Sequence, residues 1–85
     1  MEHNQQREMD IQKYSRHIEK LTIESNLEIK NYAILMFDNL NKLKKDGSLK
    51  TFIDNVPPLT VTSPSLESNS LNYMRDRIIQ LFEVK

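Results

Sequence analysis

The chain has 85 residues, of which 28% are charged, and its 12 acidic residues balance its 12 lysines and arginines. This length allows one domain, and the balanced charge excludes a disordered acidic chain and a strongly basic, histone-like DNA-binding protein. Cysteine is absent, which excludes disulfides and thiolate metal sites and leads us to expect an intracellular protein. A chain this short forms only a thin core alone, so we expect partners.

No glycine or proline interrupts the first 46 residues, and we predict one long helix over residues 4–46. Such a helix would be roughly 65 Å long, too long for the rest of the chain to wrap. Apolar residues recur along it at spacings of three and four in two seams that are offset by one residue: Ile11, Tyr14, Ile18 and Leu21, then Ile29, Ala33, Met36, Leu40 and Leu43. A stripe of Ile23, Leu27, Ile34 and Phe37 lies beside the second seam, so the helix is predicted to contact at least two neighbours.

The predicted long helix ends at Gly47, which supplies a left-handed stop after a lysine-rich last turn. Ser48 is predicted to cap a short helix over residues 48–56 that contains Ile53 and Val56, and Pro57 ends it. Residues 57–69 are rich in proline and serine and read as a linker. Ser63 precedes a proline there and is a candidate phosphorylation site.

A C-terminal amphipathic helix is predicted over residues 70–84, with Ser70 as its N-cap. Leu71, Met74, Ile78 and Leu81 follow the three-four spacing of a helical stripe, and Phe82 widens it. The linker is long enough for this helix to fold back on the first helix or to bind elsewhere.

The sequence carries no pattern typical of catalysis or cofactor binding. His3 and His17 are far apart and lack converging partners, and one glycine cannot form a phosphate-binding loop. We therefore expect no enzyme activity, no catalytic residues, no cofactor, no metal and no small-molecule substrate. Residues 32–37, the longest apolar stretch, are too few to cross a bilayer, so no membrane insertion is expected.

The lysines at 42, 44, 45 and 50 form the one basic cluster and could meet phosphate. Lysines at a helix end also complement the helix dipole, and no aromatic residues are interleaved with them. The second reading is favoured, so nucleic acid is not an expected partner.

Residues 49–57 resemble the exit of the borealin/Dasra N-terminal region, where a charged helix ends in an aliphatic–polar–polar–aliphatic–proline motif. Ile53, Val56 and Pro57 match that motif, and Leu27-Glu28-Ile29 is similar to the helix entry, so the resemblance covers about residues 21–57. It implies a small subunit of the chromosomal passenger complex, which acts in chromosome segregation and cell division. The resemblance further implies a three-helix bundle with a survivin-type protein and an INCENP-type scaffold, and a nuclear, chromosomal location. If the chain is not a member of that complex, we expect a cytoplasmic location.

The sequence as a whole predicts an all-α, elongated, non-catalytic adaptor subunit that joins a helical bundle or coiled coil with partner proteins. Two alternatives remain open. The chain could be a small subunit of another eukaryotic assembly, such as a kinetochore, transcriptional or tethering complex. It could also be a homodimeric helical regulator or inhibitor of phage or plasmid origin. The predicted partner interface comprises Ile11, Tyr14, Ile18, Leu21, Leu27, Ile29, Ala33, Ile34, Met36, Phe37, Leu40, Leu43, Ile53, Val56, Leu71, Met74, Ile78, Leu81 and Phe82.

Overall fold

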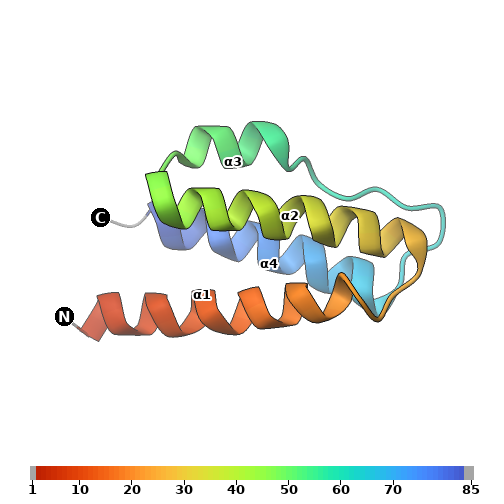
Figure 1. Ribbon diagram of the computed structural model, residues 1–85, viewed down its shortest axis with the longest axis horizontal. Helices are drawn as coiled ribbons and strands as arrows, with labels where there is room; N and C mark the ends of the chain where they lie inside the picture. Colours follow the sequence, from red (N-terminus) through yellow and green to blue (C-terminus); the bar gives the residue numbers. More distant parts are fainter. Residues whose placement is uncertain (1, 84–85) are drawn as a thin grey trace.

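The computed structural model describes residues 2–83, and side chains within residues 6–83. Over this range the chain is all-α, as predicted, and contains four helices and no strand (Figure 1). These helices are α1 (Glu2–Leu21), α2 (Leu27–Asp46), α3 (Leu49–Asn55) and α4 (Leu66–Glu83). Helix α1 runs antiparallel to α2 and α4, and α3 lies along α2 (Figure 1).

The predicted single helix over residues 4–46 is wrong, because the chain reverses direction between Leu21 and Leu27. Asn26 caps the second helix: its Oδ1 accepts the backbone N–H of Ile29 at 3.0 Å. The hydroxyl of Ser25 donates to the carbonyl of Leu21, and the N–H of Glu24 donates to the carbonyl of Lys20 at 2.9 Å. The two helix ends therefore satisfy their own polar groups without glycine or proline.

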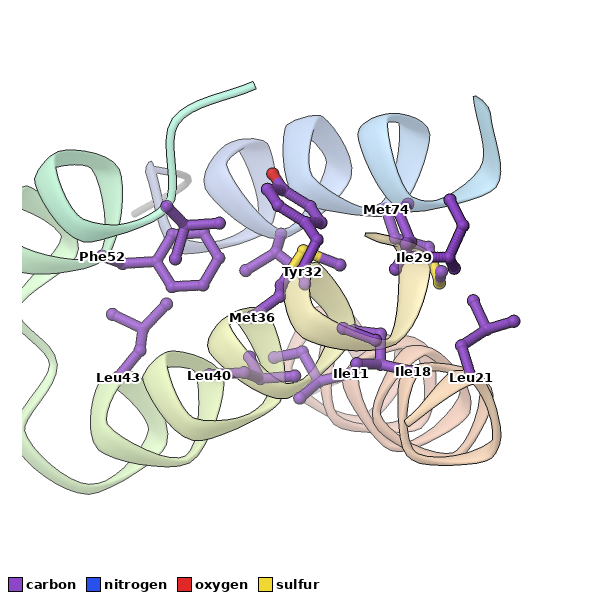
Figure 2. Packing of buried hydrophobic residues seen from close by; sticks show 14 residues of the cluster. Ile11, Ile18, Leu21, Ile29, Tyr32, Met36, Leu40, Leu43, Phe52 and Met74 are labelled. Carbon is purple, nitrogen blue, oxygen red and sulfur yellow. The ribbon is translucent and has the colours of Figure 1, made fainter. Parts of the chain in front are cut away.

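The reversal lets the chain cover its own apolar side. The longest dimension is 40 Å and the radius of gyration is 12.6 Å, close to the value of about 12 Å for a compact domain of this length. The predicted rod is therefore wrong. Figure 2 shows Ile18, Met36 and Leu40 in one cluster with Phe52, and all four side chains are 0–1% exposed.

The end of α2 agrees with the sequence prediction. Gly47 has a positive φ of 73°, and its N–H donates to the carbonyl of Leu43 at 2.8 Å. Ser48 caps α3 through the N–H of Thr51. Asn55 of α3 donates to Asn39 of α2 at 3.1 Å, which ties the short helix to the long one.

Helix α4 begins four residues before the predicted Ser70, so the linker is shorter than the predicted 57–69. Ser65 and Ser68 each accept the other's backbone N–H, at 3.1 and 2.8 Å, in a reciprocal cap. The predicted helix end at Val84 lies outside the described residues.

Side chains of α4 hold the extended segment that leads to it. Arg75 Nε donates to the carbonyl of Val56 at 2.6 Å, and Asn72 bonds both backbone groups of Leu59, at 2.8 and 2.9 Å. This segment is therefore fastened along α4.

Candidate interaction surfaces

Most of the predicted partner interface faces the interior of this chain. The residues that are buried in its own core are Ile11, Ile18, Leu21, Ile29, Ala33, Met36, Leu40, Leu43, Val56, Leu71, Met74 and Ile78. The prediction that these side chains contact another chain is therefore wrong, because they contact each other within this chain. The physical reason is the turn before Asn26, which places α1 and α2 face to face.

The remaining predicted interface residues divide into two groups. Tyr14, Phe37, Leu81 and Phe82 are partly buried and pack against the core. Leu27, Ile34 and Ile53 are exposed, by 72%, 43% and 37%. The second group is the most accessible to a partner.

Figure 1 shows that α1 ends, and α2 and α4 begin, at the same end of the molecule. Three large apolar residues at or next to these helix ends are exposed. We call Ile23, Leu27 and Leu66 the end patch; their exposed fractions are 71%, 72% and 81%. Single exposed apolar residues are ordinary on protein surfaces. Three of them at one end of a small domain form a candidate contact surface.

An open groove of about 680 Å³ lies between α1 and α4. We call it the α1/α4 groove. Its lining residues are Met9, Gln12, Lys13, Tyr14, Arg16, His17, Lys20, Ser70, Tyr73 and Met74. Met9 and Tyr73 are exposed, and none of the described residues lining the groove is acidic. The groove therefore combines apolar surface with local positive charge.

A smaller hollow of about 220 Å³ continues the α1/α4 groove toward the end patch. It shares His17, Lys20 and Ser70 with the groove, and Leu66 of the end patch lines it. Glu24 and Glu67 also line it, so negative charge stands at this end.

Tyr32 is a buried ionisable residue that contacts the extended segment. Its hydroxyl donates to the carbonyl of Pro57 at 2.7 Å. Burial raises the pKa of Tyr32 to about 12, although nearby Arg75 acts in the opposite direction. The phenol stays neutral at ordinary pH and fastens the chain, which is a structural role.

The other chemically notable residues do not converge on a site. Within residues 6–83, whose side chains are described, no three His, Asp or Glu side chains gather as metal ligands. Lys44 and Lys45 lie in the last turn of α2, and exposed Lys50 pairs with Asp54 at 2.9 Å. Ser63 is exposed, and its phosphorylation stays a prediction. No helix in the described range is long and apolar enough to cross a membrane.

The sequence analysis missed Met9, Leu66 and Tyr73 as exposed apolar side chains. A signal for the groove was present in α1, because Met9, Lys13, Arg16 and Lys20 follow a spacing of four, three and four. No signal in α1 indicated that Tyr73 would lie across from this stripe, since that contact depends on how α4 folds back.

Comparison with family models, curated proteins and solved structures found no match to this chain. The candidate surfaces are therefore argued from their own geometry and chemistry.

Proposed function

We propose that this chain is a non-catalytic helical adaptor or inhibitor that folds by itself and binds a partner protein through its exterior. The observation that carries this proposal is the end patch, where Ile23, Leu27 and Leu66 stay exposed although the core is closed. Binding at the end patch would leave the core untouched, so the chain needs no partner to fold.

The physical basis is burial of apolar surface. Covering a side chain of this size contributes on the order of 1.5–3 kcal/mol. Three such side chains can anchor a contact, provided that the partner offers a complementary apolar surface. Since the turn and helix starts that carry them are already ordered, little conformational entropy is lost on binding.

The test is co-purification from the native cell with a tagged chain. The wild type is expected to recover a specific partner, and the double variant Ile23→Asp, Leu27→Asp is expected to lose it. Ile53→Asp is the matched control, because Ile53 is an exposed apolar residue on α3, outside the end patch. Equal recovery by wild type and double variant would contradict the proposal.

Co-purification, together with sedimentation of the purified chain, separates the alternatives that the sequence left open. Recovery of survivin-type and INCENP-type proteins would support membership of the chromosomal passenger complex, which stays a prediction. Recovery of other proteins would support a subunit of a different assembly. Sedimentation of the purified chain as a dimer, lost in the double variant, would instead support a homodimeric regulator.

A further inference from the structure

We propose that the α1/α4 groove binds an acidic amphipathic helix supplied by the partner protein. This inference rests on the proposed function, since it names the chemistry of the partner. It uses a surface whose main part is separate from the end patch, so the two can be tested independently.

The shape of the groove fits a helix. Met9, Lys13, Arg16 and Lys20 lie along one side of α1 at heptad-like spacing, and Tyr73 of α4 lines the groove with them. From Met9 to Lys20 the stripe is roughly 16 Å long, which matches about three helical turns of an occupant. Grooves of this kind hold a helix by apolar anchors at every third or fourth residue.

The apolar anchors are available in the isolated chain. Met9 is 63% exposed and Tyr73 is 60% exposed. Tyr14 and Met74 line the same groove and belong at the edge of the core. Methionine and tyrosine are well suited to a helix contact, because methionine adapts its shape and tyrosine buries a large ring at low entropic cost.

The charge of the groove selects acidic residues on the occupant. Lys13, Arg16 and Lys20 are basic residues that line the groove, and no acidic residue is among its described lining. The whole chain has no net charge, so this positive region is local. Carboxylates on both flanks of the occupant's apolar stripe would meet it.

Nucleic acid fits this groove less well. Glu24 and Glu67 line the adjoining hollow near Leu66, where their carboxylates would repel a phosphate backbone. These two carboxylates also favour one orientation of the bound helix. A helix with a lysine or arginine at that end and acidic residues elsewhere complements the charge of the whole groove.

The experiment uses a synthetic, fluorescein-labelled helical peptide of about 14 residues. It carries leucine and phenylalanine on one face, glutamate on the flanks and one lysine at an end. Fluorescence anisotropy at low salt is expected to give saturable binding. A peptide with every glutamate changed to lysine is expected to bind at least about tenfold more weakly, because it repels the groove.

Matched variants locate the site. Lys13→Glu with Arg16→Glu is expected to weaken binding of the acidic peptide at least about tenfold, since two attractions become repulsions. Lys42→Glu with Lys45→Glu makes the same change of charge on exposed α2 positions and is expected to leave binding unchanged. Circular dichroism confirms that each variant keeps its helices. Tyr73→Ala is expected to weaken binding without changing its salt dependence.

Several results would overturn the inference. These are no saturable binding of the acidic peptide, equal binding of the charge-reversed peptide, or equal effects of the two double variants. Tighter binding of a DNA or RNA duplex, lost in Lys13→Glu with Arg16→Glu, would assign the groove to nucleic acid. Self-association lost in that variant would assign it to a second copy. A cellular partner that needs Ile23 and Leu27 but not Lys13 and Arg16 would sink this inference alone.

Discussion

The inner and outer faces of α1 follow the same helical period but have different fates. Ile11, Ile18 and Leu21 on the inner face are at most 7% exposed and close the core. Met9 and Lys13 on the outer face line the α1/α4 groove. Spacing therefore identifies a face of a helix, whereas the residue types on that face, together with the chain's turns, decide what it contacts.

The largest expected difference between the two faces is in stability. Ile18→Ala is expected to lower the free energy of unfolding by about 2–5 kcal/mol, because it leaves a cavity in a closed core. Met9→Ala is expected to change it by less than about 0.5 kcal/mol, since Met9 is largely exposed. Urea unfolding followed by circular dichroism measures both. Similar losses in the two variants would erase the distinction between the faces.

The comparison between buried and exposed positions also predicts how stability depends on pH, through buried Tyr32 and exposed Tyr73. Tyr32 has a pKa of about 12 in the folded chain, whereas in the unfolded chain its pKa is near 10.0, the ordinary value of a tyrosine. The contribution of Tyr32 to stability is therefore complete below pH 10 and is lost as pH rises through about 12, by about 2–3 kcal/mol.

Tyr32→Phe removes this component of the alkaline loss of stability. Tyr73→Phe is the matched control, because Tyr73 is 60% exposed and lies in the α1/α4 groove. Urea unfolding at a series of pH values, compared between variants and wild type, cancels the titration of the other groups. Identical alkaline profiles for Tyr32→Phe and the wild type would contradict the burial of the Tyr32 phenol.

The smallest effect concerns the turn that makes the two faces different. Asn26→Ala is expected to lower the free energy of unfolding by about 1 kcal/mol, because it removes the cap at the start of α2. Ser70→Ala is expected to have little effect, since Ser70 lies inside α4 and caps nothing there. Thermal unfolding of both variants provides the measurement. A larger loss for Ser70→Ala would place the start of α4 where the sequence alone suggested.

The sequence predicted the local features that depend on a single residue type. Gly47 ends α2, and Ser48 caps α3, because each conformation is set by that residue and its near neighbours. The all-α class also followed from apolar spacing. The offset between the Leu21 and Ile29 seams marked the place where the helix breaks, but the lack of glycine and proline favoured continuity.

The features that the sequence did not predict depend on contacts between residues that are distant in the chain. Tyr32 bonds Pro57, and Arg75 bonds Val56, so neither link has a signature in the local sequence. The α1/α4 groove is of the same kind, because Tyr73 joins Met9 only after α4 has folded back. Twelve of the residues predicted to need a partner are buried by the chain itself, whereas Leu27, Ile34 and Ile53 stay exposed.

The central claim is that one chain closes its own core. The most direct measurement is the urea midpoint of the purified chain over a roughly hundredfold range of protein concentration. The structure predicts one cooperative transition whose midpoint does not change with concentration. A midpoint that rises with concentration would mean that the core forms between chains, and would contradict the account.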